Sequence, residues 1–329
     1  MKIVVLANTD RQQQIFKKDH LDAFAQYGEV VINSSSVGPD ENQAADLLKD
    51  ADIAITSWNC PRLTDEVIAG SPNLRLLLHA AGSVKGIVSE ALWDRGIRVS
   101  GAAAALGKGV AETALGLTIS SLKNFYNLAN VTRFGGWNGQ NNTVREIYDV
   151  TVGVIGAGYA GRHYITLLQN FDVDILLYDP TLDEKDCTEL GTKKTSLDEL
   201  MGKSDVVSIH APSISATHHL INQSNLKLMK DRAVLINTAR GTIIIENDLI
   251  DELMLGRISA CIDVTDPEPP SETNQLRNLP NVMLTPHIAG SVTNGKKRIG
   301  DLILSELESY INDGILNYEV KPENLPTLA

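Results

Sequence analysis

The chain has 329 residues, 43% of them hydrophobic and 21% charged, and this length suggests two globular domains. Its net charge of −12 repels nucleic-acid phosphates and anionic membrane surfaces. We therefore expect a small-molecule partner, and neither a nucleic acid nor a membrane.

The cysteine content and the apolar runs indicate the compartment. Cys60, Cys187 and Cys261 form no CxxC pair, which fits a reducing compartment and argues against a disulfide framework. The N-terminal apolar stretch is shorter than the core of a signal peptide, and no run approaches the ~18 apolar residues of a membrane span. These features predict a cytoplasmic protein. His218 and His219 are adjacent without a third ligand at suitable spacing, so we expect no metal site.

Short β-rich runs alternate with helical patterns through the first third of the chain, as in a parallel sheet covered on both faces. The expected strands are Lys2–Leu6, Val30–Asn33, Asp52–Thr56, Leu74–His79 and Arg98–Ser100, and the expected helices are Arg11–Tyr27, Glu41–Lys49 and Ser89–Arg95. Nothing in this part looks like a phosphate-binding loop. Trp58, just after one of these strands, either lines a substrate site or covers the edge of the domain.

A second strand–helix series follows a Gly- and Asn-rich loop at Arg133–Asn142. Its expected strands are Val150–Ile155, Val173–Tyr178, Val206–His210, Ala233–Asn237, Ile258–Ile262 and Val282–Thr285. Two long amphipathic helices, Gly109–Asn130 and Ser291–Ile311, flank this series, and the second leads into a tail that returns to the first domain. The pattern predicts an α/β fold of two doubly wound parallel sheets, with one domain inserted into the other.

The second series opens with a buried strand that runs into the pattern G-x-G-x-x-G and then into a helix. In such a turn Gly156 permits the tight bend, Gly158 allows the backbone to approach a pyrophosphate, and Gly161 allows the helix to pack closely on the strand. The amides of Tyr159 and Ala160 would lie at a helix N-terminus, which attracts phosphate. The turn therefore predicts a dinucleotide site.

Asp179 ends the next strand, about 20 residues after the third glycine, where an acid binds the adenosine ribose hydroxyls. A carboxylate there repels a 2′-phosphate and so favours NAD over NADP. The alternative is an ordinary turn with a solvated Asp179. The expected architecture is thus a Rossmann NAD-binding domain, residues 104–291, inserted into a flavodoxin-like substrate domain, residues 1–103 and 292–329.

Polar residues follow neighbouring strands of the second series, beyond the carboxyl ends where ligands of open α/β sheets bind. Reduction of a 2-oxo acid needs a cation that binds the carboxylate and polarises the ketone, and Arg240 suits this role. It also needs a proton donor near neutral pH, such as His287, and a carboxylate that orients the imidazole, such as Glu268. Taken singly, each residue also fits a structural role: a phosphate-neutralising arginine, a solvated turn acid or a satisfied strand-end histidine.

The sequence resembles the D-isomer-specific 2-hydroxyacid dehydrogenases, the family of D-glycerate, D-lactate and phosphoglycerate dehydrogenases and of glyoxylate and hydroxypyruvate reductases. The matching motifs, in chain order, are Ala80–Ser83, Val110–Glu112, Arg133–Trp137, the glycine turn, Asp179, His210–Pro212 with Thr217, Ile236–Gly241, Asp263 with Glu268–Pro269, and Thr285–Gly290. The resemblance implies that Arg240, Glu268 and His287 are the family's catalytic arginine, glutamate and histidine. It also implies a homodimer built through the cofactor domain, with a cleft that closes on substrate.

The resemblance implies ligand contacts as well. Asp263, together with backbone near Thr238, matches the groups that bind the nicotinamide carboxamide, and Val110 matches a residue beside the nicotinamide ring. Gly82 and Ser83 match the loop whose amides hold the substrate carboxylate. The remaining contacts that the motifs imply for NAD are at Ala239, Arg240, His287, Gly290, His210, Ala211, Pro212 and Thr217.

Two positions depart from the family pattern, and both face the substrate in the family. Lys85-Gly-Ile-Val88 stands where many members carry an Asp-Asn-x-Asp-like run, and Leu106 replaces an Asn or Asp four residues before Val110. Leu106 removes a polar partner, which favours a less polar or differently shaped substrate. Lys85 either meets an anionic tail of the substrate or is solvated.

The sequence thus predicts the NAD-dependent interconversion of a 2-oxo acid and a D-2-hydroxy acid. An alternative from another class is a non-catalytic NADH-binding sensor or corepressor on the same fold, because a fold alone does not fix a function. A third alternative keeps the fold but uses formate or phosphite as the donor. Leu106, in place of the usual Asn, disfavours formate.

Overall fold

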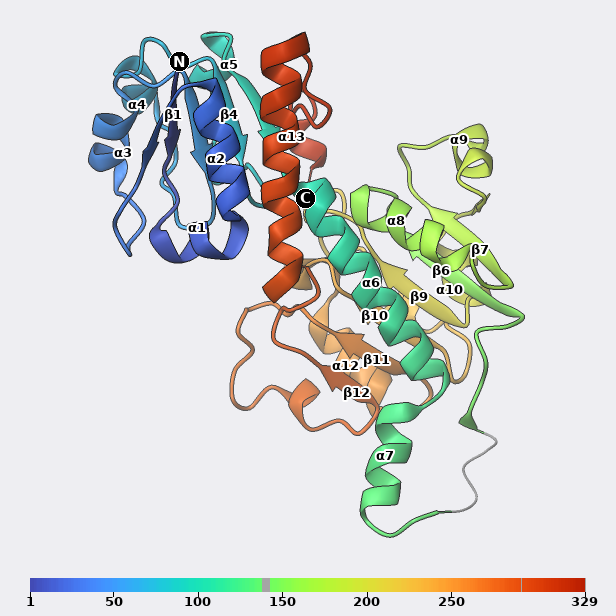
Figure 1. The fold of residues 1–329 in the computed structure, drawn as a ribbon. Coiled ribbons are helices and arrows are strands. Elements are labelled where there is room, and N and C mark those ends of the chain that lie inside the picture. Colours follow the sequence, from blue (N-terminus) through green and yellow to red (C-terminus); the bar gives the residue numbers. More distant parts are fainter. Residues whose placement is uncertain (138–142, 291, 329) are drawn as a thin grey trace. The chain divides into compact units, whose positions relative to one another are not determined.

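The computed structural model describes residues 1–137, 143–290 and 292–328. The chain divides into two compact units: unit 1 comprises Met1–Leu106 and Ser291–Ala329, and unit 2 comprises Gly107–Gly290. Each unit is a parallel sheet flanked by helices (Figure 1). The fold class expected from the sequence is therefore confirmed, whereas the exact domain limits, 1–103 with 292–329 and 104–291, stay a prediction.

Unit 1 is built on a five-stranded parallel sheet in the order β2-β1-β3-β4-β5. Its strands are β1 (Lys2–Val5), β2 (Glu29–Ile32), β3 (Ile53–Thr56), β4 (Leu76–His79) and β5 (Arg98–Gly101). Its helices are α1 (Thr9–Ile15), α2 (Lys18–Tyr27), α3 (Glu41–Leu48), α4 (Asp65–Ala69), α5 (Glu90–Asp94) and α13 (Lys297–Asp313). The strand order is that of flavodoxin-like sheets, whose ligands bind beyond the carboxyl ends of the strands.

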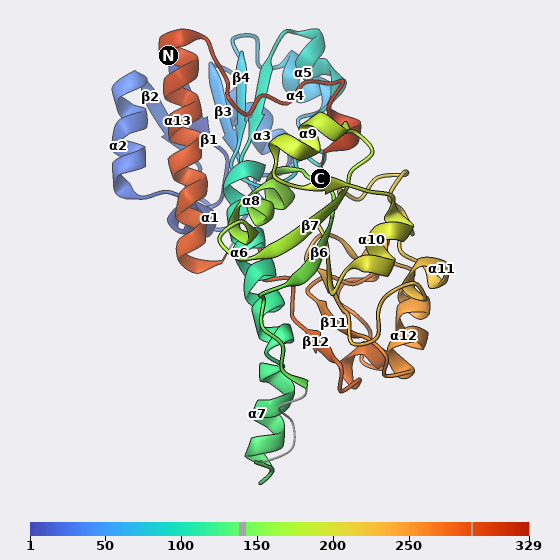
Figure 2. The same ribbon diagram turned by 90° about the vertical axis from the view of Figure 1, so that its right-hand side faces the viewer.

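Alternate residues of the central strand β1 enter the two cores of unit 1. Val4 packs on the side of Leu48 and helices α3–α5, whereas Ile3 and Val5 pack with Phe24 on the side of α1, α2 and α13. Figure 2 shows α2 and α13 together on this second face. Because both faces are covered, the strands are continuous apolar runs, which is why they could be predicted from the sequence.

Unit 2 is built on a seven-stranded parallel sheet in the order β12-β11-β10-β9-β6-β7-β8. Its strands are β6 (Val150–Ile155), β7 (Val173–Tyr178), β8 (Lys193–Lys194), β9 (Val206–Ile209), β10 (Val234–Asn237), β11 (Ser259–Ile262) and β12 (Val282–Leu284). Its helices are most of α6 (Ala103–Leu122), then α7 (Phe125–Arg133), α8 (Tyr159–Leu168), α9 (Glu184–Glu189), α10 (Leu197–Lys203), α11 (Gln223–Leu226) and α12 (Glu246–Met254). The order β8-β7-β6-β9-β10-β11 is that of dinucleotide-binding sheets, extended by β12.

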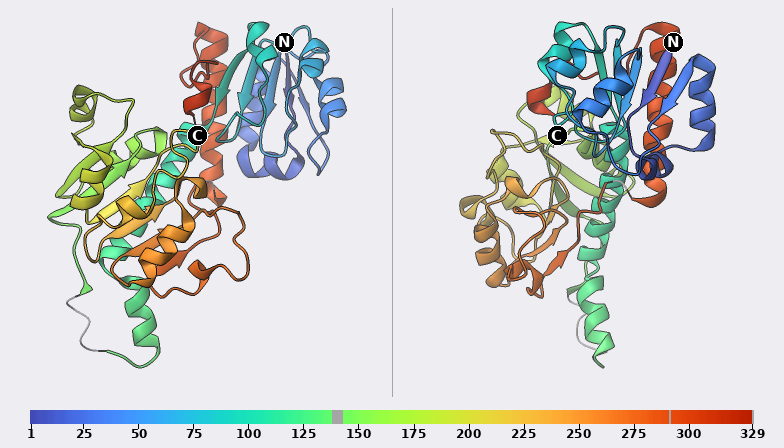
Figure 3. Two further views of the ribbon diagram at one scale, coloured as in Figure 1. Left: turned by 180° about the vertical axis from the view of Figure 1, so that it is seen from behind. Right: turned by 90° about the vertical axis from the view of Figure 1, so that its left-hand side faces the viewer.

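The sheet of unit 2 also lies between two apolar cores. Helices α6 and α8 cover one face, where the fully buried Tyr164 packs with Val152 and Val154. Helices α10, α11 and α12 cover the other face, around Leu200, Leu226 and other buried side chains (Figure 3). The helices on both faces hold the sheet in place, and the carboxyl ends of its strands lie along one edge, where the candidate site is found.

The helix expected at Arg11–Tyr27 consists of two helices, α1 and α2. Between them Phe16 is extended, with φ −94° and ψ 139°. Its ring is buried and meets Phe24 edge-on at 5.6 Å between centroids. The burial of this aromatic ring overrides the local helical pattern.

The helix expected at Gly109–Asn130 is likewise interrupted, and it begins earlier. α6 starts at Ala103, is apolar around much of its circumference, and is separated from α7 by Asn124, whose φ of 53° is left-handed. Asparagine is among the residues that adopt this conformation most readily. The left-handed conformation of Asn124 therefore divides the expected helix into two.

Two further expectations fall partly outside the described residues. In the loop expected at Arg133–Asn142, Arg133 is the last residue of α7, and residues 138–142 are not described. The helix expected at Ser291–Ile311 is α13, which a 3₁₀ turn at Thr293–Lys296 precedes. Ser291 itself lies outside the described residues.

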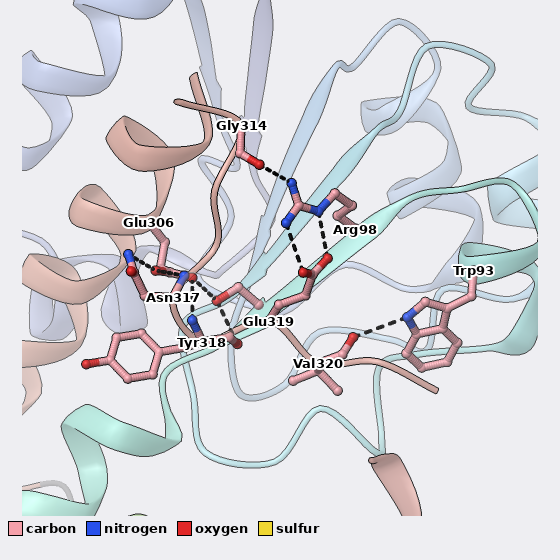
Figure 4. Close-up of polar contacts among 9 residues, drawn as sticks. Trp93, Arg98, Glu306, Gly314, Asn317, Tyr318, Glu319 and Val320 are labelled. Atoms are coloured by element: carbon pink, nitrogen blue, oxygen red, sulfur yellow. Dashed lines mark hydrogen bonds and ion pairs between the residues drawn. The ribbon is translucent and has the colours of Figure 1, made fainter. Parts of the chain in front are cut away.

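A buried glutamate fixes the C-terminal tail to unit 1. Glu306 of α13 is 1% exposed, and its carboxylate accepts hydrogen bonds from the Ser100 hydroxyl at 2.6 Å and from the amides of Asn317 at 2.9 Å and Tyr318 at 3.1 Å (Figure 4). The tail therefore returns to β5 through bonds that satisfy a buried charge.

An ion pair supports the same return of the tail. Arg98 of β5 binds Glu319 with two nitrogens, Nε at 2.6 Å and Nη2 at 2.9 Å, as Figure 4 shows. This bidentate contact with Arg98 lowers the pKa of Glu319.

Candidate active site

The glycine turn after β6 has the geometry that a dinucleotide requires. Gly156 has a φ of 91°, which favours glycine. A Cβ on Gly161 would lie 2.1 Å from the carbonyl oxygen of Gly156, so α8 packs directly on the turn. Nothing lies within 4 Å of a Cβ placed on Gly158, so the backbone there faces open space. The amides of Tyr159 and Ala160 begin α8 beside Gly158, at the helix end that attracts phosphate.

Asp179 lies at the end of β7 and is hydrogen-bonded to the glycine turn. Its Oδ2 accepts a hydrogen bond from the amide of Ala157 at 2.8 Å, and its Oδ1 accepts bonds from the amide and hydroxyl of Thr181 at 2.9 and 2.7 Å. These bonds hold the half-buried carboxylate beside the turn. The contact with a ribose stays a prediction.

Two buried polar atoms at the ends of neighbouring strands have no hydrogen-bond partner in the described part of the chain. They are Nδ1 of His210, after β9, and Oγ1 of Thr238, after β10. Nε2 of His210 lies 2.9 Å from the Ser208 hydroxyl, and burial lowers the pKa of His210 to about 3, so the ring is neutral. Buried polar atoms without partners are costly unless a ligand pairs with them, so this edge of the sheet fits a bound dinucleotide.

The segment after His210 forms a wall beside the glycine turn. A Cβ on Gly156 would lie 2.7 Å from the amide nitrogen of Ala211, which shows how closely the two backbones approach. The Thr217 hydroxyl donates to the Pro212 carbonyl and accepts a bond from the amide of Ile214 at 3.1 Å. The loop is thus held by its own bonds.

His287 and Glu268 form a pair at the carboxyl edge of the same sheet. His287 Nδ1 lies 2.5 Å from Glu268 Oε1, and the side chains are 45% and 41% exposed. Because Nδ1 is bound to the carboxylate, Nε2 is the nitrogen that remains for a ligand, and it has no partner among the described residues. The structure therefore brings together two of the three residues expected to carry the chemistry.

Asp263 braces the turn that carries His287. It is 2% exposed, and its carboxylate accepts hydrogen bonds from the Thr285 hydroxyl at 2.6 Å and from the amides of Ile288 at 2.9 Å and Ala289 at 2.8 Å. His287, between these positions, has a left-handed φ of 51°. The sequence pattern does not predict this bracing role, and the contact of Asp263 with a nicotinamide carboxamide stays a prediction.

Arg240 has an exposed side chain on a short loop after β10. Its Nη1 donates to the Ala239 carbonyl at 2.7 Å, and within the described residues no acid lies within 4.0 Å of it. Asn237 holds this loop, since its side chain donates to the Arg240 carbonyl at 3.0 Å and accepts from the Ala239 amide at 3.1 Å. Asn237 was not predicted, although an amide at the end of a buried strand is a signal of such a role. The guanidinium is thus available to an anion.

Helix α6 supports the same edge of the sheet. The Thr113 hydroxyl donates to the Ala289 carbonyl at 3.1 Å, and a Cβ on Gly109 would lie 2.1 Å from the Gly290 carbonyl oxygen. The half-buried Val110 lies between these two contacts along the helix. The segment of α6 that carries Val110 therefore packs against the turn after His287.

A cavity of about 430 Å³ adjoins the pair of Glu268 and His287. Its lining combines apolar side chains, including Pro269 and Leu284, with Arg277 and the carboxylate of Glu268. This volume lies within the range that small-molecule sites occupy in proteins.

In unit 1, the loop after β4 carries Gly82 and Ser83, and a buried histidine supports it. His79 is 2% exposed, and its Nδ1 lies 2.9 Å from the Thr56 hydroxyl. Burial lowers the pKa of His79 to about 4, although a hydrogen bond to the backbone of Ser83 opposes the shift. A Cβ on Gly82 would lie 3.1 Å from Cδ1 of Leu106, so that side chain packs against the loop. His79 was not predicted from the sequence.

Lys85, on the same loop, contacts the C-terminal tail. Its Nζ donates to the Leu328 carbonyl at 2.5 Å. The structure thus gives this lysine a partner within unit 1 that neither sequence interpretation, an anionic tail of the substrate or solvent, included.

Residues 1–137, 143–290 and 292–328 contain no group of three His, Cys, Asp or Glu side chains that could hold a metal ion. Among them, no helix combines the length and apolar character that crossing a bilayer requires. The His218 and His219 rings stack on each other, 3.8 Å apart.

The strand order of unit 2, its glycine turn, the acid after β7 and the histidine–carboxylate pair define the class of dinucleotide-dependent oxidoreductases. The family model for the "D-isomer specific 2-hydroxyacid dehydrogenase, NAD binding domain" matches residues 115–289. Since this match covers more than half of the chain, the chain belongs to the D-isomer specific 2-hydroxyacid dehydrogenases, NAD-dependent oxidoreductases of 2-hydroxy and 2-oxo acids. Unit 2 therefore contains the NAD-binding domain of this family.

Similar proteins extend the likeness beyond unit 2. A glyoxylate reductase from Thermofilum pendens is 31% identical over 303 residues, which cover 88% of each chain. A D-3-phosphoglycerate dehydrogenase from Methanocaldococcus jannaschii is 28% identical over 311 residues, which cover 94% of this chain and 58% of that protein. Among solved structures, an acyclic imino acid reductase in complex with NADPH and D-Arg has a TM-score of 0.79 and 26% identity, with 98% of this chain and 100% of that chain covered.

Proposed function

We propose that this protein interconverts a 2-oxo acid and a D-2-hydroxy acid with NAD(H). The observation that carries the proposal is the contact of 2.5 Å between His287 Nδ1 and Glu268 Oε1, which leaves Nε2 for the reacting oxygen. A histidine held in this way can give and take a proton at one defined atom. The nicotinamide cofactor, when bound, supplies a hydride to C2 of the substrate or accepts one from it.

Each side chain of the site has a role in this scheme. His287 Nε2 donates a proton to the carbonyl oxygen in reduction and accepts the hydroxyl proton in oxidation. Glu268 fixes the tautomer and the orientation of the ring. Arg240 binds the carboxylate and polarises the carbonyl through its planar guanidinium. In unit 1, the backbone amides of Gly82 and Ser83 bind a carboxylate of the substrate.

We assign the cofactor contacts on the same basis. The turn binds the pyrophosphate, Asp179 binds the adenosine ribose, and the unpaired atoms of His210 and Thr238 are available to the cofactor. The complete proposed set is Gly156, Gly158, Tyr159, Ala160, Gly161, Asp179, His210, Ala211, Pro212, Thr217, Thr238, Ala239, Arg240, Asp263, His287, Gly290 and Val110.

The test is NADH oxidation with a panel of glyoxylate, hydroxypyruvate, pyruvate and bulkier branched or aromatic 2-oxo acids. We expect turnover of at least one, and we expect His287→Ala to lower kcat by about 10²- to 10⁴-fold with NADH affinity nearly unchanged. His218→Ala, at an exposed histidine, is the matched control and should keep full activity. NADH binding without turnover on any substrate would instead favour a sensor or corepressor, and full activity of His287→Ala would refute the assigned role.

We also propose that the chain forms a homodimer through unit 2. Helix α7 has no buried residue, and the segment after it exposes Phe134 (86%) and Trp137 (84%). Large aromatic side chains exposed to this degree mark interaction surfaces. Light scattering should therefore give the mass of a dimer for the native chain and of a monomer for Phe134→Ser/Trp137→Ser. A native monomer at micromolar concentration would contradict the proposal.

A further inference from the structure

Two cationic side chains of unit 1 meet at one neutral acceptor. Arg11 Nη1 and Lys296 Nζ both donate to Gln14 Oε1, at 3.1 and 2.6 Å. Both cations are half-buried, and neither forms an ion pair within 4.0 Å with an acid in the described residues. Burial lowers the pKa of Lys296, and the charge of Arg11 lowers it further. The pair therefore has an uncompensated positive charge.

Trp58 holds the arginine in place without neutralising it. The Cζ atom of Arg11 lies 5.6 Å from the centroid of the Trp58 ring, a cation–π distance. The contact restricts the guanidinium and leaves the N–H groups that do not bind Gln14 for an oxyanion. The indole ring of Trp58 thus forms one side of the space around the Arg11 guanidinium.

These side chains lie at the ligand-binding edge of the sheet in unit 1. Arg11 is in the helix after β1, and Trp58 follows β3, which pairs with both β1 and β4. The Ser57 hydroxyl donates to the Ala80 carbonyl at 3.0 Å and so ties the Trp58 segment to the loop after β4. Ligands of parallel α/β sheets bind at this edge.

We infer that Arg11, Lys296 and Trp58 form a subsite for a second anionic group of the substrate, a carboxylate or a phosphate distal to its 2-oxo acid group. The inference rests on the proposed function, because it assigns the substrate of that reaction to the dianionic 2-oxo acids. Arginine binds a planar or tetrahedral oxyanion through two N–H groups, and lysine adds a compact charge. Lys85, the cation that the sequence suggested for such a tail, is bonded to the Leu328 carbonyl instead.

The first experiment compares substrates that have a second anionic group with counterparts that lack it. NADH-dependent reduction of 2-oxoglutarate is measured against 2-oxopentanoate, and that of 3-phosphohydroxypyruvate against hydroxypyruvate. We expect Arg11→Met and Lys296→Met each to raise KM for a dianion about tenfold or more, and to change KM of its monoanionic counterpart far less. The pair with the larger effect identifies the group as carboxylate or phosphate.

The control for this comparison is Lys49→Met, which removes an exposed lysine at the end of α3 and should alter neither pair. Equal losses for dianion and monoanion would overturn the inference, and so would unchanged KM values in the double variant Arg11→Met/Lys296→Met. A native preference for the monoanion in both pairs would also overturn it, while the proposed reaction would stand.

A binding measurement separates the subsite from the reaction. The chain has three tryptophans, so Trp93→Phe/Trp137→Phe leaves Trp58 as the sole indole reporter. Titration with inorganic phosphate and with malonate should give a saturable change in its fluorescence that Arg11→Met abolishes and Lys49→Met keeps. In the native chain, phosphate should likewise protect Lys296 from acetylation, as measured by peptide mass spectrometry.

The two experiments fail in different ways. Saturable binding without reduction of any 2-oxo acid would refute the proposed function and keep the subsite. Reduction without anion binding, without protection of Lys296 and without discrimination between the paired substrates would refute the subsite alone.

Discussion

Gly161 faces the carbonyl oxygen of Gly156 so closely that a Cβ on Gly161 would lie 2.1 Å from that oxygen, whereas Gly158 faces open space. A methyl group should therefore lower stability at one position of this turn and weaken NADH binding at the other. Gly161→Ala should lower the free energy of unfolding by more than about 2 kcal/mol, because backbone atoms must move apart. Gly158→Ala should melt almost as the native chain does but bind NADH weakly. Thermal melts and NADH fluorescence titrations measure both, and native NADH affinity in Gly158→Ala would contradict the pyrophosphate assignment.

The carboxylate of Asp179 should set the preference for NADH over NADPH. Asp179→Asn keeps an acceptor for the amide of Ala157 but removes the charge that repels a 2′-phosphate. We expect the ratio of kcat/KM for NADH to that for NADPH to fall about tenfold or more. Asp174→Asn, on the same strand and exposed, is the control and should leave the ratio unchanged. A ratio that does not move in Asp179→Asn would mean that another group excludes the phosphate.

Glu268→Gln should lower kcat about tenfold or more with NADH affinity nearly unchanged, because an amide replaces the carboxylate that fixes the His287 ring through Nδ1. Both side chains are half-exposed, so the melting temperature should hardly change. Steady-state kinetics and NADH fluorescence titrations of the native chain and Glu268→Gln test this. A native kcat in Glu268→Gln would show that Glu268 does not act through the histidine.

The stability of unit 1 should fall with pH below 6.5 because of His79. Its pKa is about 4 in the folded chain, against 6.5 for an unperturbed histidine. Between these values the unfolded chain binds a proton that the folded chain excludes, so the free energy of unfolding falls as the pH falls; above pH 6.5 the histidine causes no such loss. The shift corresponds to about 3 kcal/mol at most. His79→Asn should flatten the dependence of stability on pH between pH 6.5 and 4, whereas His218→Asn should not.

Glu306 should be essential to the attachment of the C-terminal tail. In Glu306→Gln an NH₂ group faces donors that now bind a carboxylate oxygen, among them the amides of Asn317 and Tyr318. We expect a loss of about 2–4 kcal/mol in the free energy of unfolding, measured in urea, because a buried donor is left against another donor. Glu308→Gln, two positions along the same helix, should cost far less. Equal losses in the two variants would mean that charge alone matters.

The strands could be predicted from the sequence because parallel strands covered on both faces are continuous apolar runs. The breaks in the helices could not be predicted in the same way. Phe16 leaves the helical conformation because its ring is buried against Phe24, and Asn124 separates α6 from α7 with a left-handed residue. Both depend on tertiary context that no local pattern contains.

Within the candidate site, residues that follow strands could be named from the sequence because strand ends meet at one edge of a sheet. The contact between Glu268 and His287 is of this kind. The bracing role of Asp263, the buried His79 and the pair of Arg11 and Lys296 could not be predicted, because their partners come from distant segments whose approach the sequence pattern does not specify.

The close packing of Gly109 on Gly290 means that the polypeptide leaves unit 2 at the place where it entered. Because its two ends meet, unit 2 can be exchanged as a single segment. The gene segment for residues 107–290 can be replaced by that of a relative without lengthening either junction. Chimaeras of this design keep the loop of Gly82 and Ser83 and the C-terminal tail of this chain intact.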